Sequence, residues 1–244
     1  MYYRLHILAN ECIVYLSKIL FKFCVELKMG RNALFITFEG PEGAGKSTQI
    51  KLLRDYLTAN GYKVLVTREP GGTPLAEEFR NIVKHYHGEE PLYPATELLL
   101  FEAARAQHVN YVIKPALNDG VIVLCDRFTD STAAYQGAGR SLDEDFLQQL
   151  NNFAASDCMP DLTLLFDLPV EIGLARAEVR AANVINHNDR LEEEKIDFHQ
   201  RVRNCYLAIA EREPGRVKVL DATLPIAELF EQVKLQVSNA LPRI

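Results

Sequence analysis

Residues 38–48, Phe-Glu-Gly-Pro-Glu-Gly-Ala-Gly-Lys-Ser-Thr, form the stretch that decides the fold of this sequence. They follow a short β-rich run, LFITFE at 34–39, and precede a segment in which Ile50, Leu53 and Leu57 mark one helical face. The pattern G-x-x-x-x-G-K-[ST] between a strand and a helix is typical of a phosphate-binding loop, because backbone N–H groups and the positive helix end face phosphate oxygens. A Gly-rich turn that merely packs well is the less favoured alternative. The residues expected to hold a nucleotide here are Gly40, Pro41, Glu42, Gly43, Ala44, Gly45, Lys46, Ser47 and Thr48.

Two side chains of this loop predict specific chemistry. Lys46 should reach the β- and γ-phosphates of a nucleoside triphosphate, and Ser47 should ligate Mg²⁺. Asp126 directly follows the apolar run 121–125, so it is expected at the carboxyl edge of the sheet as the metal's carboxylate. Arg127 follows at once and suggests a second, anionic substrate, although a surface ion pair is the alternative for this residue taken alone.

From residue 30 onward, short apolar runs alternate with longer segments of helical periodicity. The runs at 63–67, 121–125, 162–166 and 217–220 resemble the run at 34–39 and lack strict polar–apolar alternation. Such runs are typical of strands buried on both faces, as parallel sheets require. The sequence therefore predicts an α/β, three-layer P-loop fold, with a five-stranded parallel sheet and helices on both faces. Residues 30–244 are expected to form one domain, whose length beyond the usual size is expected to lie in mobile segments that cover the substrate.

The composition excludes several classes of protein. The chain has 244 residues, 48% apolar and 25% charged, which are ordinary globular values and exclude disordered and fibrous proteins. A net charge of −6 argues against a dedicated nucleic-acid partner. The five cysteines are odd in number and form no C-x-x-C, so a disulfide framework or a zinc site is not expected. This usage fits a reducing cytoplasm.

Residues 1–29 form an N-terminal extension that differs from the rest of the chain. They contain no run of about 18 apolar residues, so no membrane span is expected. Charged residues interrupt their apolar segment, so they fit a signal peptide poorly. Three interpretations remain open: a surface amphipathic helix, a partner-docking helix, or upstream sequence translated from a wrong start. Met29 stands just ahead of the first strand and favours the third, which predicts that the extension is dispensable.

Other residues suggest a second ligand beside the loop. Phe101 and Arg105 are four apart in a helical segment and offer a ring to stack on a base and a guanidinium to bond its carbonyl edge. Arg68 closes the second strand, before the turn at 69–73. Three further candidates share a helical face after Asp126, namely Thr132, Tyr135 and Gln136.

At this point the chain resembles the bacterial thymidylate kinases, over nearly all of residues 30–244. The matching segments are FEGPEGAGKST (38–48), TREPGGT (67–73), LLFEAARAQHV (99–109), DRFTDSTAAYQGAGR (126–140) and DRLEEEKIDFHQRVRNCY (189–206). The resemblance implies Mg²⁺-dependent transfer of the γ-phosphoryl group of ATP to dTMP, giving dTDP and ADP on the route to dTTP, by a cytoplasmic homodimer.

The resemblance also implies roles for single residues. Phe101 would stack on thymine and Arg105 would bond its O4, while Glu39 would lie near the 3′-hydroxyl and the metal. The loop at 220–223 would lie beside the donor adenine. The acceptor phosphate would be held by Arg68 and Arg127, and the sugar and base would be surrounded by Thr132, Tyr135 and Gln136.

The interior of the phosphate loop contains no basic residue, so a catalytic cation is expected from the lid. The lid is expected at about 176–190, where Arg176 and Arg180 lie one turn apart and Arg190 lies at the end. Which of the three acts is left open, with Arg180 ranked first. The expected catalytic set is therefore Lys46, Arg127, Arg176 and Arg180.

Two other functions remain as alternatives. One is a nucleoside monophosphate kinase of other or broader specificity. The other is a non-catalytic, nucleotide-dependent switch or scaffold. Guanine-specific switches carry N-K-x-D, and no Asn in this chain precedes a Lys. The additional arginines argue against a switch of any kind.

Overall fold

The structure is a computed structural model that describes residues 33–182, 190–191 and 194–241, with residues 180 and 181 described by their backbone alone. The predictions made for the N-terminal extension, and those for the lid at 183–189, lie outside the described residues. In the part of the chain described, no helix has both the length and the apolar character that crossing a membrane requires.

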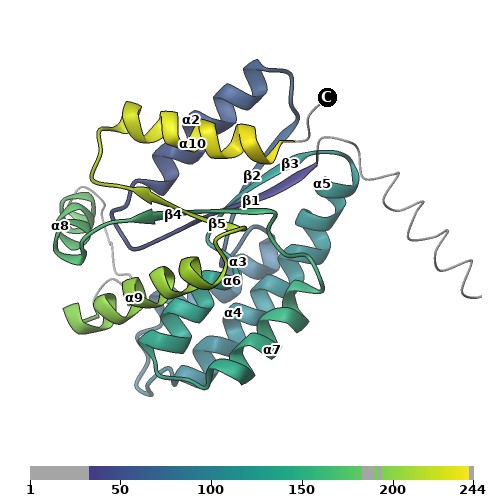
Figure 1. Cartoon of the computed structure of the whole chain (residues 1–244). Helices are drawn as coiled ribbons and strands as arrows, with labels where there is room; N and C mark the ends of the chain where they lie inside the picture. The colour runs from purple at the N-terminus through teal and green to yellow at the C-terminus, as the bar shows by residue number, and fades with distance from the viewer. Residues whose placement is uncertain (1–32, 183–189, 192–193, 242–244) are drawn as a thin grey trace, which may run out of the picture.

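A parallel sheet forms the centre of the molecule (Figure 1). Within the described residues it has five strands in the order β2-β3-β1-β4-β5, and every neighbouring pair is parallel. The five runs expected from the sequence are all confirmed, with bounds that differ by one residue at four of them. The strands are β1 (Leu34–Glu39), β2 (Val64–Arg68), β3 (Ile122–Asp126), β4 (Leu162–Asp167) and β5 (Val217–Asp221).

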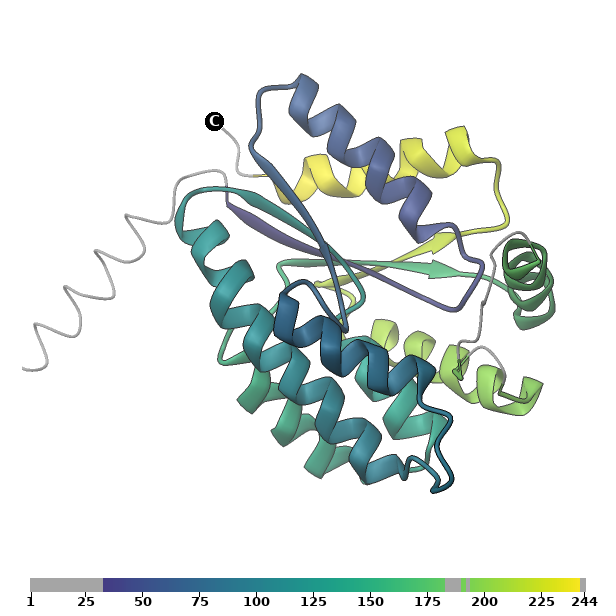
Figure 2. The ribbon, with the colours of Figure 1, turned by 180° about the vertical axis from the view of Figure 1, so that it is seen from behind.

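Helices cover both faces of the sheet, which confirms the three-layer α/β fold (Figures 1 and 2). One face carries α2 (Lys46–Ala59) and α10 (Ile226–Ala240). On the other face lie α3 (Pro74–His85), α4 (Pro94–His108), α6 (Thr129–Thr132), α7 (Glu144–Ala155) and α9 (Ile196–Arg212). The remaining described elements are α5 (Lys114–Asn118), α8 (Val170–Ala181) and the π-helical segments η1 (Val109–Ile113) and η2 (Ala133–Gly139).

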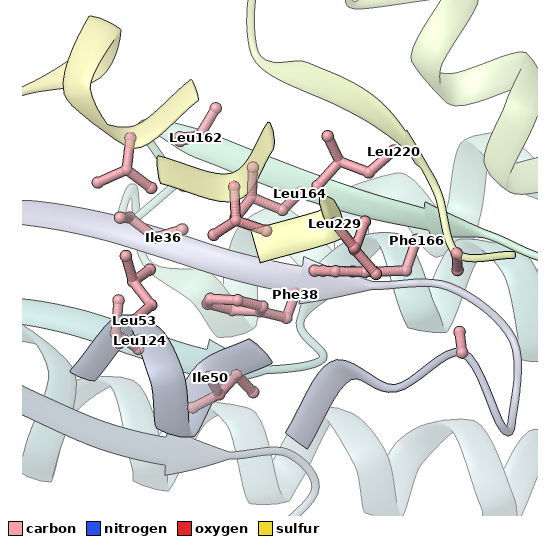
Figure 3. Packing of buried hydrophobic residues seen from close by; sticks show 14 of the residues in the cluster. Ile36, Phe38, Ile50, Leu53, Leu124, Leu162, Leu164, Phe166, Leu220 and Leu229 are labelled. Atoms are coloured by element: carbon pink, nitrogen blue, oxygen red, sulfur yellow. The ribbon is translucent and has the colours of Figure 1, made fainter. Parts of the chain in front are cut away.

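The two faces of β1 supply two different parts of the core. Successive side chains of a strand point to opposite faces. Ile36 and Phe38 accordingly pack against Leu53 of α2 and Leu229 of α10 (Figure 3), whereas Phe35 packs on the other face. All six residues of β1 are buried, as expected for the central strand of a sheet covered on both sides.

The sheet brings the candidate residues to its carboxyl edge. In the parallel register Arg68, the last residue of β2, lies opposite Asp126, the last residue of β3, and Asp126 lies opposite Phe38. The phosphate loop leaves β1 at the same edge and enters α2 after Gly45. In open α/β sheets this edge is where ligands bind.

Glycine is required at two positions of the loop. Gly40 has φ +130°, and a Cβ there would lie 2.4 Å from the backbone oxygen of Phe166. Gly43 has φ +71°, and its Cβ would lie 2.3 Å from the oxygen of Gly173. The loop is therefore fixed in shape by close backbone contacts that a side chain would prevent.

Candidate active site

A cavity of about 500 Å³ lies at the carboxyl edge of the sheet. Its volume is in the range of small-molecule sites, about 300–1,000 Å³. The loop contributes residues 42–48 to its wall. Other expected site residues in the wall are Arg68, Phe101, Asp126, Arg127, Tyr135, Gln136 and Arg176.

Lys46 begins α2 and is buried under the phosphate loop. Its Nζ donates to the carbonyl oxygens of Gly40 at 3.0 Å and Pro41 at 2.8 Å. Burial, and secondarily the positive charge of Arg127, lowers the pKa of Lys46 to about 8. An anionic phosphate beside the ammonium would favour its charged form again.

Ser47 and Asp126 form a pair suited to Mg²⁺. The Ser47 hydroxyl donates to Oδ2 of Asp126 at 3.3 Å. Oδ1 of Asp126 is buried and has no hydrogen-bond partner among the described residues. In that part of the chain no group of three or more His, Cys, Asp or Glu side chains could hold a metal. The pair is suited to Mg²⁺, which proteins often hold through only one or two side chains. Water and substrate phosphates then complete the coordination shell of the ion.

Arg127 is the polar centre of the site. It has φ 69°, which is uncommon for a residue with a side chain. Its Nη2 donates to Oε1 of Glu42 at 2.5 Å and to the hydroxyl of Tyr135 at 3.1 Å, and its Nη1 donates to the carbonyl oxygen of Gly40 at 3.1 Å. The guanidinium also lies over the Tyr135 ring, 4.9 Å from its centroid. Arg127 is therefore held against the loop that is expected to bind the donor.

Glu39 lies behind the loop and is fully buried. It accepts hydrogen bonds from the Phe128 backbone at 2.7 Å, the Ser131 hydroxyl at 2.6 Å and the Tyr206 hydroxyl at 3.0 Å. Burial, and secondarily the negative charge of Asp130, raises the pKa of Glu39 to about 7. Glu39 is not among the residues that line the cavity, so its expected contact with the 3′-hydroxyl stays a prediction.

Arg105 lies behind the cavity wall rather than in it, and only 1% of it is exposed. Its Nε donates to Glu69 at 2.8 Å, its Nη1 donates to Glu102 and Asn151, and its Nη2 donates to the Thr132 hydroxyl at 2.8 Å. Arginine has five N–H donors, so one N–H of Nη2 remains for a ligand. The bond to the base O4 stays a prediction.

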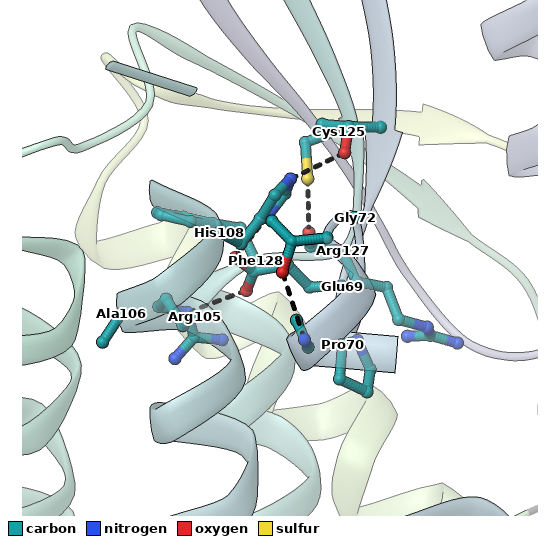
Figure 4. Close-up of polar contacts among 12 residues, drawn as sticks. Glu69, Pro70, Gly72, Arg105, Ala106, His108, Cys125, Arg127 and Phe128 are labelled. Carbon is teal, nitrogen blue, oxygen red and sulfur yellow. Dashed lines mark hydrogen bonds and ion pairs between the residues drawn. The ribbon is translucent and has the colours of Figure 1, made fainter. Parts of the chain in front are cut away.

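The Glu69 carboxylate joins Arg105 to a histidine. Oε2 accepts from Arg105, while Oε1 lies 3.0 Å from Nδ1 of His108; the cluster is drawn in Figure 4. Cys125, on the neighbouring strand β3, is fully buried. Sequence reasoning did not assign Glu69, Glu102 and Asn151, because nothing in their spacing places them around one guanidinium.

Arg68 and two basic residues of α3 form another part of the cavity wall. Arg68 donates to both carboxylate oxygens of Glu77 at 3.0 Å. Arg80 and Lys84 line the same cavity from α3 and were missed by the sequence analysis. Their four-residue spacing places them on one helical face, which is the signal that could have found them.

A neighbouring cavity of about 480 Å³ lies where the donor base is expected. It is lined by residues 43–45 of the loop and by residues 222–226. Two residues of the 220–223 loop, Ala222 and Thr223, are in its wall. Arg176 lines both cavities, and its Nη1 donates to the carbonyl oxygens of Gly43 at 3.4 Å and Ala222 at 3.2 Å.

The other lid arginines are placed differently. Arg180 belongs to α8, one turn after Arg176, and its side chain lies outside the described residues. Arg190 donates to Glu97 and to the carbonyl oxygen of Val83. The structure thus brings Arg176 to the phosphate loop. It brings Arg190 to the C-terminal end of α3 and the N-terminal end of α4.

These features define a class of protein. A phosphate loop with its lysine, a serine–aspartate pair for Mg²⁺ and several cations in one cavity describe a P-loop phosphotransferase with room for two phosphorylated ligands.

Comparisons with known proteins identify the family. The family model for thymidylate kinase matches residues 38–233. The thymidylate kinase of Thermomicrobium roseum is 54% identical over 209 residues, which are 86% of this chain and 96% of that protein. The thymidylate kinase of Geobacter sulfurreducens is 50% identical over 210 residues, 86% of this chain and 98% of that protein. The crystal structure of thymidylate kinase from Ehrlichia chaffeensis superposes with a TM-score of 0.68 at 34% identity, covering 84% of this chain and 99% of that one. This chain belongs to the thymidylate kinase family.

Proposed function

We propose that this protein transfers the γ-phosphoryl group of ATP to dTMP, which gives dTDP and ADP, in the cavity beside the phosphate loop. The observation that carries this proposal is the meeting of Lys46 and Arg127 at one point of that cavity, where both donate to the oxygen of Gly40. The loop binds the donor phosphates. Arg127 and Arg68 serve the acceptor phosphate, a second anion that a switch or motor does not need.

The other end of the cavity suits a pyrimidine deoxynucleotide. Phe101 offers a ring for stacking, and Tyr135 and Gln136 lie in the same wall. Arg105, behind them, has one N–H left for the base O4. Tyr135 crowds the 2′ position of the sugar and favours deoxyribose.

The reaction is governed by charge rather than by proton transfer. The second pKa of a phosphate monoester is about 6, so dTMP is mostly a dianion at neutral pH and needs no general base. The obstacle is repulsion between two polyanions. Lys46 neutralises the donor phosphates, Arg127 holds the acceptor, and the shaped loop aligns the two for in-line transfer. Arg180 is the lid cation that stabilises the transferring group, and Arg176 is the alternative for this role.

The Ser47 hydroxyl and the unpartnered Oδ1 of Asp126 would hold Mg²⁺. The ion neutralises phosphate charge when bound with ATP. We therefore expect Asp126→Asn to raise the Mg²⁺ concentration for half-maximal rate by about tenfold or more. An unchanged Mg²⁺ requirement would remove Asp126 from the metal site.

Initial rates with ATP on a panel of monophosphates test the substrate. We expect dTMP to be the best acceptor, dUMP weaker, and dCMP and dGMP poor. A panel with equal rates would indicate a kinase of broad specificity. ATP binding with no diphosphate product would indicate the switch.

We propose that the protein is a homodimer in the cytoplasm, where its nucleotide substrates are dissolved. Phe146 and Phe153 lie two turns apart on α7 and are 55% and 80% exposed, and Leu99 of the contacting helix α4 is 57% exposed. A second copy covering this apolar face would bury it. Light scattering should give a dimer mass for the wild type and a monomer mass for Phe153→Asp. Leu235→Asp, an equally apolar exposed site on α10, should stay dimeric.

A further inference from the structure

Glu97 is a fully buried carboxylate that lies outside the cavity wall. It stands in the first turn of α4. Gln136 donates to its Oε1 at 2.8 Å, Arg140 donates to both oxygens at 3.2 Å, and Arg190 donates to Oε2. Three segments far apart in the sequence therefore meet at one buried acceptor.

The charge of Glu97 fixes which end of the Gln136 amide faces it. Burial alone raises the pKa of Glu97, but the hydrogen bonds from Arg140, Gln136 and Arg190 hold it below its usual value. Glu97 is therefore ionised at neutral pH and can only accept hydrogen bonds. The NH₂ group of Gln136 must point at Glu97, and its carbonyl oxygen must point away.

That carbonyl oxygen has no partner of its own. Oε1 of Gln136 is buried and lacks a hydrogen-bond donor among the described residues, although Gln136 lines the cavity. A buried acceptor without a donor is destabilising. A ligand that brings an N–H group to this point relieves the deficit, whereas one that brings a lone pair does not.

We propose that Glu97 is a positioning residue for substrate selection: it locks the Gln136 amide with its acceptor oxygen toward the bound base. This inference rests on the proposed function, which places the base of dTMP beside Gln136. Thymine and uracil carry a ring N–H between their two carbonyl groups, whereas cytosine has a lone pair at that ring nitrogen. The locked amide thus selects against cytosine independently of Arg105. Arg140 and Arg190 keep Glu97 in place and charged.

Glu97→Gln tests the proposal because it keeps the shape of the side chain and removes the lock. Arg140 and Arg190 both donate to Oε2 of Glu97, so the oxygen of the new amide faces them and its NH₂ group faces Gln136. Gln136 must then turn its own oxygen toward position 97 and away from the base. We expect KM for dTMP to rise about 10- to 100-fold, with kcat changed less. The inhibition constant of dCMP should stay the same or fall. The ratio of kcat/KM for dTMP over dUMP should not change, since both bases carry the ring N–H.

The double variant Glu97→Gln/Gln136→Glu exchanges the two side chains and should restore the acceptor that faces the base. The amide at position 97 then donates to the carboxylate at 136, whose other oxygen again presents an acceptor to the base. We expect this double variant to recover most of the discrimination between dTMP and dCMP. Gln136→Glu alone places two carboxylates in contact and should be the poorest of the three. A purely structural role of Glu97 does not predict such a recovery.

Glu97→Asp guards against loss of folding. It keeps the negative charge that Arg140 and Arg190 contact but withdraws the carboxylate from Gln136 by one methylene. We therefore expect a smaller rise in KM for dTMP than in Glu97→Gln. ATP affinity and the melting temperature check that each variant is folded. Equal loss of dTMP and dCMP binding in Glu97→Asp and Glu97→Gln overturns the proposal. If Gln136→Leu itself leaves the dTMP-to-dCMP ratio unchanged, the placement of the base in the proposed function fails instead.

Discussion

The ammonium of Lys46 and the guanidinium of Arg127 donate to the same carbonyl oxygen, that of Gly40, at 3.0 and 3.1 Å. In the proposed function Lys46 neutralises the donor phosphates and Arg127 holds the acceptor phosphate. Two cations can approach so closely because the loop carbonyl and Glu42, 2.5 Å from Arg127, screen their repulsion. In the proposed reaction the transferring phosphoryl group lies near this point, where positive charge stabilises it most.

Arg127→Ala should lower kcat/KM for dTMP by about 100- to 1000-fold, because it removes the cation that is proposed to hold the acceptor phosphate. Steady-state kinetics at saturating ATP measure the effect. Arg212→Ala is the matched control, since Arg212 is exposed and pairs with Glu144 at the surface. Equal kinetics in both variants would show that Arg127 does not touch the acceptor.

Glu42→Gln should lower KM for dTMP by about 3- to 10-fold at low salt. The carboxylate competes with the acceptor phosphate for Arg127, and its negative charge repels both nucleotides. The gain should shrink as ionic strength rises, because salt screens the repulsion. A higher KM instead would mean that Glu42 chiefly holds Arg127 in position.

The fold could be predicted because its signals are local. The run at 34–39 has apolar residues on both faces and leads into a loop that requires glycine at positions 40 and 43, so strand, loop and helix follow from adjacent residues. Burial of β1 on both faces confirms this reading. The strand order β2-β3-β1-β4-β5 could not be read in the same way, because it depends on contacts between distant segments.

The site was predictable only where its residues follow a strand or a known spacing. Arg68 is the last residue of β2 and Arg127 directly follows β3, and both line the cavity, as their positions in the sequence predicted. Glu69 and Glu97 were missed, because each acts on a residue brought to it by folding: Arg105 in one case and Gln136 in the other. A buried carboxylate with several donors has no signature in the sequence.

Glu39 should make stability depend on pH. Its pKa rises from 4.5 in the unfolded chain to about 7 in the fold, so the native state holds a proton that the unfolded state has lost. Stability therefore falls as pH rises from about 4.5 to 7. The wild type should lose about 2 kcal/mol more unfolding free energy than Glu39→Gln between pH 5 and pH 8. Urea unfolding at several pH values measures this, and parallel curves for the two proteins would contradict it.

The lid arginines should separate by the kinetic constant that each one affects. Arg176 contacts the loop at Gly43 and the donor-side residue Ala222, so Arg176→Ala should raise KM for ATP. Arg180 is the cation proposed to reach the transferring group, and Arg180→Ala should lower kcat about 10³-fold or more with little change in KM for dTMP. Arg180→Lys should recover only part of the loss, because an ammonium lacks the planar pair of donors. Single-turnover measurements should show the loss in the chemical step. A wild-type kcat in Arg180→Ala would show that Arg180 does not stabilise the transferring group. Arg176 would then be the lid cation that does so, and Arg176→Ala should show the loss in kcat.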